Sequence, residues 1–376
     1  MIGVIVFAII LFINGDIDAA ATQKDYVKAE ELVTVVALFR HGDRAPKVEI
    51  PAMKYSRTSY WPMGLGELIP LGIQREYKLG QWLRKRYNCL LSPIYSKSEL
   101  YVRSTDKDRA LMSAYACLAG LYPPQGLQVW NDQLAWQPIP VHTIPREIDD
   151  VIVEKRTCPK YSALLNDTIN SDFFISVNEE NAEFYKNMSE WTKLDVKDVE
   201  DIKLIKSTLT SMKNYNTSYL PHWEKFVDYN LLEYLTGLMY KRYTTTLTMK
   251  RLMAGPFFHY LFDHMDSSMS SNQSSSVPKM LMISAHGTSL SIILNSMGVF
   301  DGYLPDFAST ILWELKKMAS GQLFVHTYFK SDNNLKKLAI RGCEFNCTYE
   351  NFKSAMRNIT VDIDTWKEEC YGVINK

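Results

Sequence analysis

Apolar and polar positions along the chain predict repeated units in which a buried strand is followed by a helix. Residues 32–39 form an unbroken apolar, β-branched run, which is typical of a strand that is buried on both faces. Residues 71–87 place apolar side chains on one helical face and end in a basic turn, which predicts a helix with a solvated C-terminal end. A second unit joins a short strand at residues 99–103 to a helix that ends at Leu121.

The same pattern returns towards the end of the sequence. Residues 280–285 are again apolar, and an apolar helix is predicted at residues 290–297. Three further segments have strand character: residues 310–315, 322–329 and 335–340. Because strands that alternate with helices form parallel sheets, we predict an α/β fold with a mostly parallel central sheet flanked by helices.

The middle of the chain has a different character. It is rich in Tyr, Asn, Lys and Glu from about residue 149 to residue 250, with helical patches, and a helix is predicted at residues 257–265. An extended segment, residues 136–143, precedes it. We predict three parts: an α/β core of residues 28–150 plus 277–376, an inserted helical cap of residues 151–266, and an exposed Ser-rich linker of residues 267–276.

The first residues predict export from the cell. The apolar run at residues 2–13 is too short to span a bilayer, which needs about 20 residues, and it fits the core of a signal peptide. Small residues suited to cleavage follow at residues 19–21, although no Lys or Arg precedes the run. The alternative is a buried N-terminal strand or helix. We predict a signal peptide over about residues 1–21, a secreted protein and no membrane anchor.

Composition excludes some partners. The chain has 376 residues, enough for about two domains, and 42 basic residues balance 42 acidic ones. This neutrality gives no electrostatic reason to expect nucleic acid or an anionic membrane as a partner. Any affinity for phosphate must therefore come from a local cluster of charges.

Cysteines and glycosylation signals agree with export. An even count of six cysteines behind a signal peptide favours disulfide bonds. Cys343 and Cys347 form a single C-x-x-x-C pair without a second pair nearby, which argues against a zinc site. Asn-x-Ser/Thr sequons stand at Asn166, Asn187, Asn216, Asn272, Asn346 and Asn358.

The strongest candidate chemistry follows the first strand. Arg40 and Arg44 flank His41, and Gly42 allows a sharp turn at the carboxyl end of that strand, where open α/β sheets bind ligands. Guanidinium groups match the oxygens of phosphate or carboxylate, so His41 could attack a phosphorus atom that the arginines hold. The alternative is a solvated turn with a surface histidine.

Two further strand ends carry candidate residues. Arg109 stands near the start of the helix after the second strand, where anions are favoured, although it could instead pair with Asp106 or Asp108. His286 follows the strand at residues 280–285, although it could merely cap the next helix. Because the carboxyl ends of parallel strands meet at one edge, we expect these residues to converge on His41.

The chain resembles the histidine acid phosphatases, which include prostatic, lysosomal and insect venom acid phosphatases. The resemblance rests on the motif around His41 and on an ordered series of segments: residues 61–64, 71–72, 77–80, 103–109, 118–124, 136–143 and 284–286. It implies that His41 becomes a phosphohistidine and that His286 contacts the phosphate. The phosphate clamp it implies consists of Arg40, Arg44 and Arg109.

The resemblance also implies an α/β core with a helical cap, a homodimer, and no metal or cofactor. Its disulfide pattern suggests that Cys158 pairs with Cys370 and that Cys343 pairs with Cys347. Cys89 and Cys117 lie outside this pattern, and they either pair with each other or remain free.

One position departs from the family pattern. The family usually has His-Asp at the second histidine, where the Asp protonates the leaving oxygen, whereas this chain has His286-Gly287. General acid catalysis is typically worth about 10²–10⁴-fold in rate, and the loss is smallest for a leaving group that needs no proton. Thr288 is a poor acid, and Asp43 is favoured as a structural residue, although Asp43 or water could substitute; no proton donor is assigned.

Two functions are therefore carried forward. The first is a secreted acid phosphatase that hydrolyses small phosphate monoesters through phospho-His41, slowly or with a bias towards activated leaving groups. The second is a secreted, non-catalytic relative that binds phosphorylated or other anionic ligands, of the kind found in venom or saliva. A phytase-like activity is less favoured, because a highly anionic substrate would require a more basic pocket than the net charge indicates.

Overall fold

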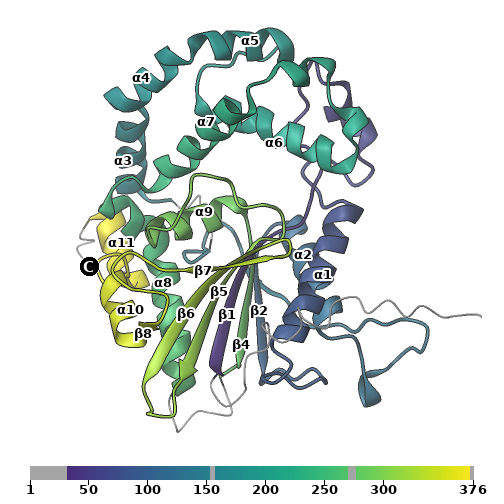
Figure 1. The fold of residues 1–376 in the computed structure, drawn as a ribbon, viewed down its shortest axis with the longest axis vertical. Coiled ribbons are helices and arrows are strands. Elements are labelled where there is room, and N and C mark those ends of the chain that lie inside the picture. The colour runs from purple at the N-terminus through teal and green to yellow at the C-terminus, as the bar shows by residue number, and fades with distance from the viewer. Residues whose placement is uncertain (1–31, 153–156, 270–276, 373–376) are drawn as a thin grey trace, which may run out of the picture.

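A mixed β-sheet forms the centre of the molecule in the computed structural model, which describes residues 32–152, 157–269 and 277–372 (Figure 1). The sheet is eight-stranded, in the order β3-β2-β4-β1-β5-β6-β7, and β8 pairs with β6. Its strands are β1 (Leu32–Arg40), β2 (Leu100–Thr105), β3 (His142–Ile144), β4 (Met280–Ala285), β5 (Thr310–Lys317), β6 (Leu323–Ser331), β7 (Asn334–Leu338) and β8 (Cys347–Thr348). The predicted signal peptide, Asn272 and most of the predicted linker lie outside the described residues.

The parallel part of the sheet is built from the predicted strand and helix units. β4 lies between β1 and β2 and is parallel to both, and β3 is parallel to β2. The predicted α/β class is confirmed. The last strands differ from the prediction of a mostly parallel sheet, because β5, β6 and β7 are antiparallel to their neighbours. The connections from β5 to β6 and from β6 to β7 are too short for the crossover that parallel strands need, so these three strands form antiparallel hairpins.

Helices cover both faces of the sheet and form the cap. They are α1 (Pro70–Arg86), α2 (Asp108–Leu121), α3 (Pro159–Ile169), α4 (Asp172–Glu180), α5 (Ala182–Thr192), α6 (Val199–Tyr215), α7 (Tyr229–Lys241), α8 (Leu247–Met269), α9 (Gly287–Ser296), α10 (Tyr349–Met356) and α11 (Ile363–Tyr371). Alternate residues of β1 point to opposite faces: Val35 and Phe39 pack with α1 and α2, and Val36 and Leu38 pack with α8 and α9. This alternation explains why the strand is apolar throughout.

The C-terminal end of α1 is not wholly solvated as predicted. Arg86 is buried, and its Nη2 lies 2.6 Å from Oε1 of Glu314 on β5. The Tyr87 hydroxyl donates to the same oxygen at 2.9 Å. The partner carboxylate is more than 200 residues away in the chain, so only the fold shows that this basic turn faces the interior.

The cap consists of α3 to α7 and lies over the edge at which β1, β2 and β4 end (Figure 1). It has its own apolar core, which also takes in Ile50 and Met53 from the loop after β1. α8 belongs with the sheet instead, because its buried residues, Phe258 among them, share one apolar core with β1 and β4 and the helix contacts β1.

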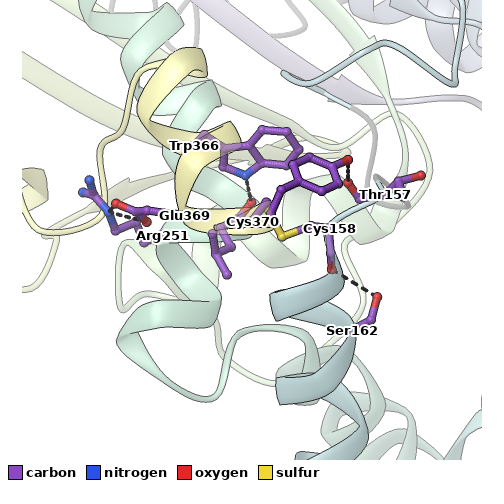
Figure 2. The surroundings of a disulfide bond; sticks show 9 residues. Thr157, Cys158, Ser162, Arg251, Trp366, Glu369 and Cys370 are labelled. Atoms are coloured by element: carbon purple, nitrogen blue, oxygen red, sulfur yellow. Dashed lines mark hydrogen bonds and ion pairs between the residues drawn. A yellow bond between two sulfur atoms is a disulfide. The ribbon is translucent and has the colours of Figure 1, made fainter. Parts of the chain in front are cut away.

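α8 also runs further in both directions than the predicted helix at residues 257–265. It includes the first residues of the predicted linker, up to Met269, and it continues through Pro256. Proline lacks an N–H group, so the carbonyl of Leu252 loses its helical partner. The indole N–H of Trp366 on α11 donates to that carbonyl at 2.8 Å (Figure 2).

Two disulfides hold the tail of the chain. Cys158, just before α3, is bonded to Cys370 on α11, and Cys343 is bonded to Cys347. Beside the first bond, Arg251 donates to Glu369 at 2.8 Å (Figure 2). Both pairings are those implied by the resemblance.

The two remaining cysteines, Cys89 and Cys117, are free, the first exposed and the second buried. Within the described residues, no helix is both long enough and apolar enough to cross a membrane.

Candidate active site

The turn after β1 is fixed by close backbone packing. The backbone N–H of His41 donates to the carbonyl of Ala285 at the end of β4, at 3.0 Å. A Cβ atom at Gly42 would lie 2.4 Å from the carbonyl oxygen of Gly72 on α1, so only glycine fits at this crossing. The N–H of Gly42 donates to the Ser113 hydroxyl on α2 at 3.0 Å. The motif is thus held against β4, α1 and α2.

His41 is held in its neutral form. Nδ1 lies 2.8 Å from the carbonyl oxygen of Gly42, which can only accept, so Nδ1 carries the proton. The lone pair is then on Nε2, in a side chain that is buried and lines a cavity. Burial lowers the pKa of His41 well below 6.5, and the positive charge of Arg109 lowers it further. The arrangement suits a nucleophile.

Arg40 and Arg44 are both positioned by fixed contacts. Nη1 of Arg40 donates to the carbonyl of Pro305 at 2.5 Å, and its guanidinium lies 3.8 Å from the ring centre of Phe307. Arg44 donates to the carbonyl of Ala45 at 2.7 Å and to the Ser207 hydroxyl of the cap at 2.6 Å.

Both guanidinium groups keep their charge despite burial. Burial lowers the pKa of Arg40 to about 10 and that of Arg44 to about 9. At neutral and acidic pH both remain cations. Cations held rigidly in a buried site can stabilise developing negative charge without reorganisation.

His286 faces His41 across the same cavity. Their ring centres are 5.4 Å apart, and Nε2 of His286 lies 2.9 Å from the hydroxyl oxygen of Thr105 at the end of β2. His286 stands at the start of α9, but its side chain makes no capping hydrogen bond. Its Nδ1 is buried without a hydrogen-bond partner among the described residues. The side chain is therefore directed to the site rather than to the helix.

The cavity has a volume of about 520 Å³ and brings together all of the residues singled out in the sequence. Arg109, from the first turn of α2, lines it with the motif residues and His286. The basic residues of its lining are Arg40, Arg44, Lys47, Lys107, Arg109, Arg146 and Lys203. Its acidic residues are Glu200 and Asp201. The cavity is strongly positive although the chain as a whole is neutral.

Sequence reasoning missed the outer cations, which are the basic residues that line the cavity beyond the three predicted arginines: Lys47, Lys107, Arg146 and Lys203. Lys47 and Lys107 are close in sequence to the predicted residues, and a search around each motif could have found them. Lys203 and Ser207 come from α6 of the cap, and nothing in their local sequence indicates that the cap folds over the motif. Glu200 forms ion pairs with Lys203 and Arg242, so part of the cap charge is neutralised within α6 and its neighbours.

Neither Asp43 nor Gly287 offers an acid to the site. Asp43 is buried and accepts from Asn214 of the cap at 2.6 Å, and Arg75 lies 3.0 Å from its other oxygen. Burial raises the pKa of Asp43, an effect that Arg75 opposes. At Gly287, a Cβ atom would lie 2.7 Å from Cδ1 of Leu304. Asp43 therefore joins the motif to the cap, and the space beside Gly287 holds a methyl group.

Known proteins are similar to this chain in sequence and in fold. Residues 31–335 match the family described as histidine phosphatase superfamily (branch 2). The chain is 33% identical to lysosomal acid phosphatase of Xenopus laevis over 355 residues, covering 91% of this chain and 79% of the relative. It is 32% identical to prostatic acid phosphatase of Homo sapiens over 350 residues, covering 92% and 89%.

Among solved structures, the phytase from Citrobacter braakii aligns with a TM-score of 0.65 and 16% identity, covering 88% of this chain and 98% of that chain. Hafnia alvei phytase in complex with myo-inositol hexakis sulphate aligns with a TM-score of 0.66 and 16% identity, covering 89% and 98%. At this identity the likeness establishes the fold.

Proposed function

Because this chain belongs to branch 2 of the histidine phosphatase superfamily, we propose that it is a secreted acid phosphatase that hydrolyses phosphate monoesters through phospho-His41. One observation carries the proposal. The neutral imidazole of His41, with its proton held on Nδ1, shares a buried cavity with the guanidinium groups of Arg40 and Arg44. The proposed nucleophile and the proposed phosphate clamp therefore line the same cavity.

The reaction follows from this arrangement in two steps. Nε2 of His41 attacks phosphorus, an N–P bond forms, and the bond from phosphorus to the leaving oxygen breaks while the arginines hold the remaining phosphoryl oxygens. The leaving group departs with that electron pair as an oxyanion and takes its proton from solvent. We propose that the Thr105 hydroxyl, 2.9 Å from Nε2 of His286, donates to that nitrogen, so that Nδ1 of His286 carries the proton and donates it to a phosphoryl oxygen. Water then displaces phosphate from His41, and the carbonyl of Gly42 holds the imidazole in place in both steps.

Surface positions of the sequons support a glycoprotein. Among the described sequons, Asn187 is half-buried and the others are exposed: Asn166, Asn216, Asn346 and Asn358. An exposed asparagine is accessible to glycosylation. With the signal peptide predicted over residues 1–21, this supports secretion.

A second candidate function is a phosphate-binding relative without turnover. It is favoured by the methyl group of Leu304 beside Gly287, where members of the family are expected to carry their acid. Such a protein would keep the clamp of Arg40, Arg44 and Arg109 and would hold an anionic ligand without cleaving it.

A single-turnover assay separates the two candidates. We expect enzyme mixed with 4-nitrophenyl phosphate at mildly acidic pH to release a burst of about one equivalent of 4-nitrophenol, because this leaving group needs little protonation. His41→Ala should abolish the burst and lower turnover by roughly 10³-fold or more while vanadate binding persists. Saturable vanadate binding by the wild type with no burst would establish the non-catalytic alternative.

A further inference from the structure

The residue after the second histidine leaves no side chain from which a leaving group could take a proton. Gly287 lines the cavity, and a Cβ atom there would lie 2.7 Å from Cδ1 of Leu304 and 3.1 Å from Nε of Arg40. Leu304 lines the cavity as well. The side chain of Leu304 therefore occupies the space into which a side chain at position 287 would extend.

The carboxylates of the cavity do not replace the missing acid. Glu200 is held by the ammonium group of Lys203 and by Nη2 of Arg242, the latter at 2.5 Å. Asp201 accepts the backbone N–H of Lys197 at 2.9 Å. Both carboxylates are on α6 and act as acceptors, so neither presents a proton to a leaving group.

Two phenols also line the cavity. Burial raises the pKa of Tyr243, which makes it a poorer acid than free tyrosine. Tyr240 is the other phenol that lines the cavity, and Tyr240→Phe tests whether it supplies a proton.

The cavity carries more positive charge than one phosphoryl group requires. Beyond the three arginines of the clamp, Lys47, Lys107 and Arg146 line it from the loops after β1, β2 and β3. Lys47 and Arg146 are close enough to His286 to contribute to its lowered pKa, after burial and Arg109. A second anionic group on the substrate would meet these cations.

Phosphate as a leaving group satisfies both features at once. A phosphate monoester has a second pKa of about 6, whereas an alcohol is close to water at about 15.7. A departing phosphate therefore needs no proton, and its charge suits the outer cations. Resting on the proposed phosphatase function, we propose that this site preferentially hydrolyses phosphoanhydrides, such as nucleoside diphosphates and inorganic pyrophosphate.

The step balances without an acid. Nε2 of His41 attacks the terminal phosphorus, an N–P bond forms, and the bond from phosphorus to the bridging oxygen breaks. The electron pair of that bond leaves with the bridging oxygen, as a nucleoside monophosphate. Water then attacks the phosphorus, the N–P electron pair returns to Nε2, and one proton of the water passes to solvent as orthophosphate leaves.

ADP and AMP form a matched pair for the test, since they share a nucleoside and differ in the leaving group. For the wild type we expect kcat/KM to be at least about 10²-fold higher for ADP than for AMP, the lower range of a general-acid effect. ADP should be converted to AMP, which accumulates. Gly287→Asp with Leu304→Ala should restore an acid with room to lie beside Arg40, and should raise the AMP-to-ADP ratio of kcat/KM by about 10-fold or more.

Leu304→Ala alone is the matched control, and it should leave the AMP-to-ADP ratio low. Activity on 4-nitrophenyl phosphate distinguishes a failure of the proposed phosphatase function from a failure of the anhydride preference alone. No turnover of any substrate would reject the proposed phosphatase function itself. Turnover of 4-nitrophenyl phosphate with ADP no better than AMP would reject the anhydride preference alone, and a loss of AMP hydrolysis in Tyr240→Phe would then identify the acid that replaced Asp.

The outer cations have a separate test. Lys47→Ala and Arg146→Ala should each raise KM for ADP about 10-fold, with a smaller effect on KM for 4-nitrophenyl phosphate, which has no second phosphate. Lys367→Ala, an exposed lysine on α11, is the control. An equal rise in KM for ADP and for 4-nitrophenyl phosphate would show that these cations do not hold the second phosphate.

Discussion

The imidazole of His41 is kept neutral by its immediate surroundings. It is buried, its Nδ1 proton is bound to the carbonyl of Gly42, and Arg109 lies near enough to disfavour a second proton. A nucleophile must be unprotonated, and free histidine loses this form below about pH 6.5. The proposed nucleophile therefore stays unprotonated in conditions where an exposed histidine would be charged.

This environment predicts the pH dependence of the reaction. Because the pKa of His41 is lowered, its reactive neutral form persists as the pH falls through 6.5 and is lost only well below it. In a titration from pH 8 to 5 followed by NMR, the imidazole signal that His41→Gln removes should stay at its neutral position. The pH below which kcat/KM for 4-nitrophenyl phosphate declines should likewise lie well below 6.5. An imidazole that titrates near 6.5 would contradict this account.

Sequence reasoning reached some residues of the site and not others. Arg40, His41 and Arg44 are neighbours in one motif, and parallel strand topology explains why Arg109 and His286 join them. Leu304 lies in an irregular loop that no periodicity describes. The basic lining was missed because the net charge averages over the whole chain, so a phytase-like activity was less favoured on a quantity that says nothing of local charge.

Among the elements, α8 shows how tertiary contacts override a local signal. Pro256 predicts a helix end, yet the helix continues because Trp366 supplies the hydrogen bond that the carbonyl of Leu252 would otherwise lack. Strands β1, β4 and β5 lie within two residues of their predicted bounds, since buried apolar runs are unambiguous. α10 and α11 were not predicted, although both bury residues at helical spacing: Tyr349, Phe352 and Met356 on α10, and Trp366 and Cys370 on α11.

Removing this indole should destabilise the protein. Trp366→Phe leaves a buried carbonyl without a partner, which costs about 1–3 kcal/mol, in addition to any loss of packing. Urea unfolding of the oxidised protein measures the change. Trp130→Phe, measured at protein concentrations at which the chain is monomeric, is the matched control: the Trp130 indole also donates to a carbonyl, that of Trp136, but it is exposed in the single chain. That variant should change stability by less than about 0.5 kcal/mol. Equal stabilities for the two variants would contradict the role given to Trp366.

At the scale of the whole molecule, the edge of the sheet formed by β3 is a candidate interaction surface. β3 is its edge strand, and the loop before β3 extends away from the body of the molecule (Figure 1). Exposed apolar side chains gather in the segments on either side of β3: Leu127, Val129, Trp130, Leu134 and Ile148. Apolar patches beside an unpaired strand mark interaction surfaces.

We expect this edge to form the homodimer that the resemblance implies. Light scattering of the deglycosylated protein at micromolar concentration should give twice the mass of one chain. Trp130→Glu with Leu127→Glu should give one chain mass while the 4-nitrophenyl phosphate burst remains. A single-chain mass for the wild type at all concentrations would exclude the dimer.

The position of β4 between β1 and β2 has a consequence for biosynthesis. About 175 residues separate the end of β2 from the start of β4, and a ribosome that adds 5–20 residues per second needs roughly 10–35 s to make them. Throughout this interval β1 and β2 must remain apart, since direct pairing would close the space for β4. His286 follows β4, so the two histidines can meet only after this late insertion. The candidate site is thus incomplete during most of translation, and the open strand edges of the nascent chain are then the surfaces that chaperones would have to protect.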